Sequence, residues 1–297
     1  MSFLSYIISF MINYVFIQLI GMLAVFVLTG LTGMFSMGQA AFMALGGYCA
    51  AMLSRLFGFS IFINAPIAAL VGALFGFILG LPAVRLRRDY IAIITMGFGE
   101  AVVAFLNNFS SITGGALGLS SIPKETSSLG IVICLILVIG IISNFKNSRF
   151  GRQCLAIKSD ELAAACLGIN VPRIKLLAFV FAGAISAFAG SLWVHTTTYI
   201  DPSSFGFAQS SMWIIMVFFG GVNSLTGSIF GGIFLGILPE ILRFSNALRV
   251  VIYCCIVLLI INFRPQGLFG EKELTFHTIK NWLMSKKEVK SSRKGNR

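Results

Sequence analysis

The sequence predicts an all-α protein, a polytopic bundle of about nine or ten transmembrane helices of roughly 20 residues each. Of its 297 residues, 57% are hydrophobic and only 11% are charged, whereas a soluble domain carries about 25% charged residues. The mean hydropathy of +0.93 agrees with this class. So do the 31 glycines, because glycine is more frequent in membrane helices than in soluble ones.

The apolar stretches are separated by short polar or glycine-rich segments. They cover residues 4–28, 37–57, 61–84, 90–109, 129–145, 176–198, 207–221, 226–242 and 247–263. The first lacks the basic start of a signal peptide and exceeds the length of its apolar core, so we expect it to stay in the membrane. It is either one helix or two short helices broken near Asn13. The number of spans, nine or ten, and the side of the membrane on which the N-terminus lies therefore stay open. We assign residues 1–270 to the transmembrane domain and 271–297 to a basic tail.

The positive charges predict how the spans are oriented, because cytoplasmic loops are rich in Lys and Arg. Most of the 22 Lys and Arg lie in segments 85–90 and 146–175 and in the tail. Alternating helices place all three on one side, which we take as the cytoplasmic side of a bacterial-type inner membrane. The external segments are then 55–61, 110–128, 199–206 and 243–246. The net charge of +12 suits contact with an anionic lipid surface, and we expect no nucleic-acid partner.

Glycines at four-residue spacing mark two of the spans. The third span has Gly72, Gly76 and Gly80, and the eighth has Gly227, Gly231, Gly232 and Gly236. Small residues at this spacing let helix backbones approach closely in lipid. We expect them to pack helices together, either inside the subunit or against a partner subunit.

Sequence motifs of catalysis are absent, so we expect neither an enzyme nor a resident cofactor. The chain has no G-x-x-x-x-G-K-[ST], H-E-x-x-H or G-x-S-x-G motif. Its two histidines, His195 and His277, are too few for a histidine metal site, and its six cysteines lack the spacing of metal ligands. We expect His195 to be structural and Glu240 to pair with Arg243 at i, i+3.

Glu100 is the ionisable residue placed deepest in a predicted span. A charged side chain inside a membrane is costly, and it normally faces the bundle interior or a water-filled cavity. Glu100 is therefore a candidate residue of a polar pathway through the bundle. The alternative is a structural contact with Thr95, Asn107 or another helix.

The segment 146–175 is a charged stretch between two spans, and it contains a predicted helix from Asp160 to Leu167. Ser159 or Asp160 can cap its N-terminus, and Gly168 suits its C-terminal end. Its apolar residues share one face at helical spacing; they are Leu162, Ala165 and Cys166. Such a helix either docks into a groove of another protein or lies on the membrane surface.

Several segments carry motifs that occur in a fixed order along the chain. They are Arg85-Leu86-Arg87 with Asp89-Tyr90 and Thr95-x-Gly97-Phe98-Gly99-Glu100, Thr113-Gly114-Gly115-x-x-Gly118-Leu119 with Ile122-Pro123, Gly151-Arg152 with Glu161-x-Ala163-Ala164-x-x-x-Gly168, and Phe263-Arg264-Pro265-Gln266-Gly267-Leu268-Phe269-Gly270. The third set resembles the EAA loop of ABC importer permeases. Together the motifs resemble the permeases that import branched-chain amino acids, from about Gly30 to Gly270. Arg88 stands where this family usually has Gly, and Ala116-Leu117 departs from its external loop.

The resemblance implies an importer built from two permease subunits and two ATPase subunits and supplied by an external binding protein. The second permease is expected to be a paralogue of this chain, and ATP is expected to bind to the ATPases. Residues 146–175 would form the coupling loop that contacts an ATPase. Its coupling residues would be Glu161, Ala163, Ala164 and Gly168, with Arg152, Lys158 and Asp160 as polar contacts.

Two other interpretations stay open. The same fold could import urea, short amides or other amino acids, and distant relatives import sugars. An ion-coupled secondary transporter or a channel would need no ATPase, and it would usually carry more charge within its spans than this chain does.

Overall fold

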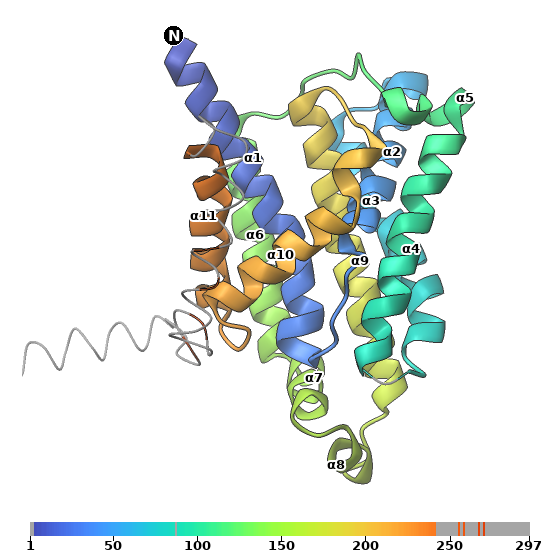
Figure 1. Cartoon of the computed structure of the whole chain (residues 1–297), viewed down its shortest axis with the longest axis vertical. Coiled ribbons are helices and arrows are strands. Elements are labelled where there is room, and N and C mark those ends of the chain that lie inside the picture. The colour runs from blue at the N-terminus through green and yellow to red at the C-terminus, as the bar shows by residue number, and fades with distance from the viewer. Residues whose placement is uncertain are drawn as a thin grey trace, which may run out of the picture.

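The computed structural model describes residues 3–86 and 88–241 and the single residues 255, 258, 267 and 270. Apart from one β-bridge between Leu119 and Ile200, the described elements are helices (Figure 1). The α-helices are α1 (Phe3–Phe26), α2 (Gln39–Phe57), α3 (Ile61–Ala83), α4 (Arg88–Asn108), α5 (Ser110–Thr113), α6 (Ser128–Asn147), α7 (Arg149–Ser159), α8 (Glu161–Cys166), α9 (Val171–Thr197), α10 (Phe207–Gly220) and α11 (Leu225–Ile241). A π-helix, η1 (Val27–Thr32), and two short 3-10 helices, η2 (Gly115–Leu117) and η3 (Pro202–Phe205), complete the list. The predicted all-α class is confirmed for this part of the chain.

Seven helical stretches in the described part are long and apolar enough to cross a membrane. They are Ser9–Thr32, Gln39–Phe57, Ile61–Ala83, Tyr90–Asn108, Ser128–Asn147, Val171–Thr197 and Pro202–Gly220, and the apolar stretch Leu225–Pro239 is shorter. α1 is continuous, so the alternative of two helices broken near Asn13 is wrong. The predicted span 247–263 and the tail lie almost wholly outside the described residues, so the count of nine stays a prediction.

Apart from the connection between α1 and α2, the connecting segments gather at two opposite ends of the bundle, as the alternation of spans predicts. The inner end, as we call it, holds α7 and α8, and the N-terminus lies at the opposite, outer end (Figure 1). At the inner end Arg88 donates to the carbonyl of Ile157, which joins the two basic segments. At the outer end Leu119 and Ile200 exchange backbone hydrogen bonds of 2.9 and 3.0 Å. That the inner end faces the cytoplasm stays a prediction from the charge.

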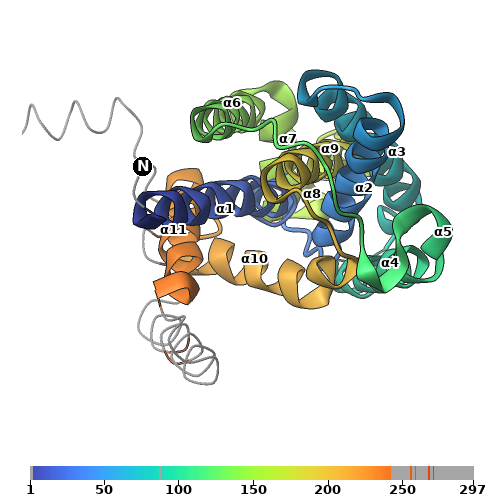
Figure 2. The ribbon, with the colours of Figure 1, turned by 90° about the horizontal axis from the view of Figure 1, so that it is seen from above.

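α1 is the central helix of the bundle. It packs against α6, α9, α10 and α11, and Figure 2 shows it between α6 and α10. Its side chains from Leu19 through the end of η1 at Thr32 are buried. A helix that is apolar on all sides is expected in such a position.

Glycine allows the closest contact between two spans, that of α3 with α9. A Cβ added at Gly72 would collide with the carbonyl of Gly183, and one at Gly76 would lie 2.8 Å from the carbonyl oxygen of Phe179. One at Gly80 would lie 2.6 Å from a methyl of Leu176. These glycines therefore lie against a helix of the same subunit.

The glycines of α11 have two different neighbours. A Cβ at Gly231 would lie 2.6 Å from the Cα of Gly220 in α10, and a Cβ at Gly220 would lie 2.2 Å from the carbonyl oxygen of Gly227. A Cβ at Gly236 would lie 3.1 Å from Val15 in α1. α11 is thus held against both α10 and the central helix.

The connection between α1 and α2 re-enters the bundle, which the sequence analysis did not predict. After η1 the chain runs without helix from Gly33 to Gly38, and α2 begins at Gln39. The Gln39 amide oxygen accepts from the hydroxyl of Ser186 at 3.1 Å. Ser186 lies about 22 Å along α9 at 1.5 Å per residue, so α2 begins near mid-depth. The amide of Met37 is satisfied by Thr95 Oγ1 at 3.0 Å.

Candidate functional site

The segment between α6 and α9 forms two helices at the inner end (Figure 1). α7 was not predicted, although its N-cap gives a local signal: Ser148 Oγ accepts from the amide of Gly151 at 3.3 Å. α8 was predicted, and its helix is confirmed. Asp160 is its N-cap and accepts from the amides of Leu162 and Ala163 at 2.8 and 3.1 Å. Gly168 ends it at φ +82°, a left-handed conformation that favours glycine.

α8 presents an apolar face to solvent. Leu162 is 80% exposed and Leu167 is 81% exposed. Ala163, Ala165 and Cys166 are exposed beside them. Ala164 is the exception, because it is buried against the bundle. Apolar residues that are exposed one after another along a short helix and its C-terminal end indicate a surface that another molecule covers.

α8 is anchored to α9 by an ion pair. The Nζ of Lys175 lies 2.6 Å from Oε1 of Glu161. Lys175 is fully buried, whereas the Glu161 side chain is 39% exposed. A buried ammonium is unfavourable without a partner, so this pair fixes the position of α8 relative to α9.

α7 is anchored to the bundle by packing and by Lys158. Cys154 and Ile157 are fully buried on its inner face, and burial raises the pKa of the Cys154 thiol to about 12. The Nζ of Lys158 donates to the carbonyl of Gly30 at 2.6 Å and to Oδ1 of Asn223 at 2.5 Å. Gly30 belongs to η1, and Asn223 lies in the turn between α10 and α11. One side chain therefore joins α7 to two other parts of the bundle.

The residues expected to contact an ATPase do not all point outward. Arg152 is exposed, and its guanidinium donates to the carbonyl of Asn147 at 2.8 Å. Asp160 is exposed but is engaged in capping α8. Lys158 reaches inward, which its position in the sequence did not reveal, because the direction of a side chain around a helix depends on its neighbours.

Glu100 lies on the exposed side of α4, so of the two expected surroundings, the bundle interior or a water-filled cavity, it does not occupy the interior of this subunit. Its Oε1 accepts from the amide of Phe207 at 2.9 Å. Phe207 is the first residue of α10, so the carboxylate caps that helix, where negative charge is favourable. The contact is with another helix, one of the structural alternatives. Its role in a pathway stays a prediction.

His195 occupies a buried polar cluster at the outer end. Its Nδ1 lies 3.2 Å from the carbonyl oxygen of Pro123. Its Nε2 lies 3.4 Å from both Ser54 Oγ and Asn64 Nδ2. These contacts join α2, α3 and α9 to the loop before α6. The side chain of Glu240 and all of Arg243 lie outside the described residues, so their pairing stays a prediction.

The glycines of the outer loop explain its sequence motif. Gly114, Gly115 and Gly118 have φ values of +73°, +58° and +69°. Residues that carry a side chain rarely adopt such φ values. A Cβ at Gly118 would also collide with the carbonyl of Ile200. The motif thus places Leu119 beside Ile200 and joins the loop after α4 to the loop after α9.

Comparison with known proteins identifies the family. The family described as "Branched-chain amino acid transport system / permease component" matches residues 7–261. The LivM protein of Salmonella typhimurium, a high-affinity branched-chain amino acid transport system permease protein, is 33% identical over 276 residues, which are 82% of this chain and 65% of that protein. LivM of Escherichia coli is 34% identical over the same shares.

A second kind of permease is also similar. LivH of Salmonella typhimurium, with the same description, is 25% identical over 189 residues, which are 63% of this chain and 61% of that protein. The matched part of the chain thus spans less than two thirds of the length of these relatives. No solved structure matches the chain. The extent of the family match and the identity to LivM show that the chain belongs to the family of permease components of branched-chain amino acid transport systems.

Proposed function

We propose that this chain is one permease subunit of an ATP-driven importer of branched-chain amino acids. An external binding protein delivers the substrate, and two separate ATPase subunits bind and hydrolyse ATP at the cytoplasmic side, where the C-terminus also lies. The observation that carries the proposal is the exposed apolar face of α8 at the inner end. Leu162 in α8 and Leu167 directly after it are each more than three-quarters exposed, which suits a groove in a partner protein.

The contacts of α7 and α8 suggest how motion of an ATPase reaches the bundle. A displaced α8 acts on α9 through the pair of Glu161 with Lys175. A displaced α7 acts on η1, which follows α1, and on the turn between α10 and α11 through Lys158. Helix α9, η1 and the turn between α10 and α11 would therefore move together with α7 and α8. ATP binding and release would then shift the bundle between two arrangements.

A second permease subunit, a paralogue of the LivH kind, would complete the pathway. The proposed position for it is the exposed side of α4, where Glu100 lies near mid-span. An exposed carboxylate at this depth is costly against hydrocarbon. A partner subunit, or a water-filled pathway between the two subunits, would remove it from lipid.

Assembly with the ATPase tests the coupling assignment. The variant Leu162→Asp introduces a charge in the α8 face and should abolish co-purification with the ATPase. The matched control is Leu117→Asp, because Leu117 is 86% exposed at the outer end and should leave assembly intact. Equal recovery of the ATPase with both variants, at equal abundance in the membrane, would refute the docking of α8.

Uptake by the reconstituted importer tests the substrate. Proteoliposomes that contain both permeases, the ATPases and the binding protein should accumulate leucine in the presence of ATP. Parallel measurements with urea and with acetamide address the alternative cargo. ATP-dependent accumulation of urea or acetamide, without accumulation of leucine, would transfer the proposal to that substrate class.

A further inference from the structure

A groove of about 290 Å³ opens between α3 and α6 near the outer end of the bundle. Its floor is formed by α9, which lies between these two helices when the bundle is seen from above (Figure 2). All three helices are long and apolar enough to cross a membrane. The residues that line the groove within these spans include Ala65 and Pro66 of α3, Gly130 and Cys134 of α6, and Phe188 and Leu192 of α9.

The walls of the groove are apolar and open to the surroundings of the bundle. Cys134 and Phe188 are half-buried, and Pro66 is exposed. Phe62, at the edge of the groove, is 86% exposed. Among the described residues, α3, α6 and α9 contribute no charged side chain to the lining. A site with such walls offers too few polar partners to hold ordered water, whereas it suits contact with hydrocarbon.

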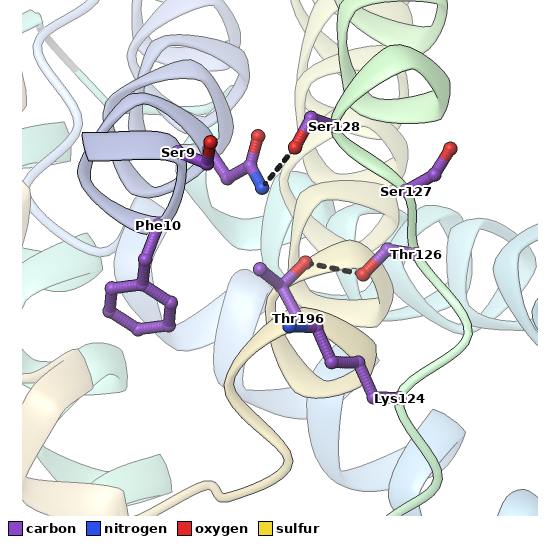
Figure 3. A pocket seen from close by; sticks show the side chains of 8 residues that line it. Ser9, Phe10, Lys124, Thr126, Ser127, Ser128 and Thr196 are labelled. Carbon is purple, nitrogen blue, oxygen red and sulfur yellow. Dashed lines mark hydrogen bonds between the residues drawn. The ribbon is translucent and has the colours of Figure 1, made fainter. Parts of the chain in front are cut away.

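The polar groups of the groove lie at its outer end and have partners within the protein. The lining at this end comes from the loop before α6. Oε2 of Glu125 accepts from the amide of Ile61 at 2.6 Å. The hydroxyls of Thr126 and Thr196 lie 2.8 Å apart, and Figure 3 shows this bond beside a neighbouring cavity. The loop is therefore fixed to α3 and α9, and these polar groups need no ligand inside the groove.

The length of the groove matches one leaflet of a membrane. Phe188 lies nine residues before the end of α9 at Thr197, which is about 14 Å along the helix at 1.5 Å per residue. Half of a hydrocarbon core of roughly 30 Å is about 15 Å. The volume of the groove fits an acyl chain as well. A methylene group is about as large as a water molecule, which occupies roughly 30 Å³ in the liquid, so the groove takes about ten methylene groups.

We propose that this groove holds one acyl chain of a phospholipid from the leaflet at the outer end. The acyl chain lies along α9 between α3 and α6, with its ester end toward the loop before α6. Filling the groove gives its apolar walls the dispersion contacts that an empty space would not supply. Within the described residues α6 packs mainly against α1 and α7, so the acyl chain also fills the space between α6 and α3.

A partner subunit is the other candidate to cover the groove. The exposed carboxylate that needs a polar neighbour, Glu100, belongs to α4. Figure 2 shows α4 on the other side of the bundle from α6. The uncharged walls between α3 and α6 therefore favour lipid as the neighbour on their own side. This inference requires only that the protein crosses a membrane, so it does not depend on the proposed importer function.

Photolabelling of the unmodified protein tests the occupant. The full chain, with any subunits that stay attached, is reconstituted with phosphatidylethanolamine that carries a diazirine in the middle of one acyl chain. Loosely bound lipid is then washed away in detergent before irradiation. Peptide mass spectrometry should find the label on Cys134, Phe188 or Leu192 in the groove. Ile133, which is 53% exposed on the same helix as Cys134, should not be labelled, because lipid at an open face is lost in the wash.

Two matched pairs of substitutions fill the groove or leave it open. Cys134→Trp places an indole ring in the groove, and Ile133→Trp is its control on the exposed face of α6. Gly130→Leu adds a side chain to the wall, where a Cβ would meet only Ser127 Oγ, at 3.3 Å. Gly140→Leu is its control, because a Cβ there has nothing within 4 Å. Native mass spectrometry should show a single retained phospholipid for the unmodified protein and both controls, and loss of that phospholipid from both filled variants.

Three results would overturn the proposal. The first is equal retention of phospholipid by all four variants, and the second is labelling of Ile133 as often as of the groove residues. The third is loss of the label from the groove when a partner subunit is bound, because the groove would then be a contact between subunits. If the filled variants do not reach the membrane, labelling of the unmodified protein still decides the question. None of these measurements depends on transport, so failure of the importer proposal would be seen separately in the uptake assay.

Discussion

Replacing Lys158 by Met should separate ATP hydrolysis from uptake. The change removes the ammonium that binds the carbonyl of Gly30 and the side chain of Asn223. The methionine side chain keeps most of the apolar stem, so α7 should still pack through Cys154 and Ile157. The connection from α7 to η1 and to the turn between α10 and α11 would then be weakened without removing the helix.

The size of the effect follows from the two hydrogen bonds. Bonds to a charged group contribute about 1.5–3 kcal/mol each. Lys158 is only partly buried, so the lower value applies, and the connection loses about 3 kcal/mol. Because about 1.4 kcal/mol corresponds to a factor of ten, this loss of free energy can reduce uptake by about 100-fold at most. We expect uptake per assembled complex to fall between about 10-fold and 100-fold, while ATP hydrolysis continues.

The assay is leucine uptake and ATP hydrolysis measured in the same proteoliposomes. Arg149→Met is the control, because it removes the same charge from an exposed position of α7. Asn223→Ala removes one of the two acceptors and should give an intermediate loss. The double variant with Lys158→Met should lose less than the sum of the two single effects, because both remove the same bond. Equal leucine uptake by the Lys158→Met and Arg149→Met variants would refute the role of Lys158 in passing motion from α7 to the bundle.

Three further changes test other parts of the structure. Maleimide at neutral pH should label exposed Cys166 but not buried Cys154, because the raised pKa of the Cys154 thiol, about 12, leaves little reactive thiolate. Bound ATPase should protect Cys166 from labelling. Labelling of Cys166 at an unchanged rate in the assembled complex would contradict docking of α8. Glu100→Gln keeps an acceptor for the N-terminus of α10, so this variant should assemble normally but show reduced uptake. Glu100→Ala also loses about 1 kcal/mol of helix capping. Normal uptake by the Glu100→Gln variant would end the pathway assignment. Gly72→Ala should lower stability by about 1–3 kcal/mol through overpacking, measured as the thermal midpoint, while Gly140→Ala, with nothing within 4 Å, should not; equal midpoints would show that α3 and α9 are not in close contact.

Local signals in the sequence were sufficient for several elements. The limits of α8 follow from an Asp that caps one end and a Gly that adopts a left-handed conformation at the other. The predicted stretch 207–221 agrees within one residue with helix α10, because its apolar run is bounded by glycines on both sides. The alternation of the connecting segments between two ends followed from the distribution of Lys and Arg. These properties depend on neighbouring residues or on total charge, which a sequence contains directly.

Hydropathy alone misplaced the start of α9. The predicted span began at residue 176, because Arg173 and Lys175 interrupt the apolar run, whereas the helix begins at Val171 after the cap of Asn170. Lys175 is nevertheless fully buried. Its charge is tolerated there because Glu161, 14 residues earlier, lies within 2.6 Å, and the hydropathy of the segment does not contain that pairing.

What only the tertiary structure decided are the directions of polar side chains and the depth at which a helix begins. The re-entry before α2 depends on Gln39 and Ser186, which are 147 positions apart in the chain. Lys158 points inward because Gly30 and Asn223 meet beside it, and Glu100 lies on the exposed side of α4 while it caps α10. Hydropathy determines which segments enter the membrane, because it is summed over each segment. Which way a polar group points is determined by the partner that satisfies it, and those partners come together only in the folded bundle.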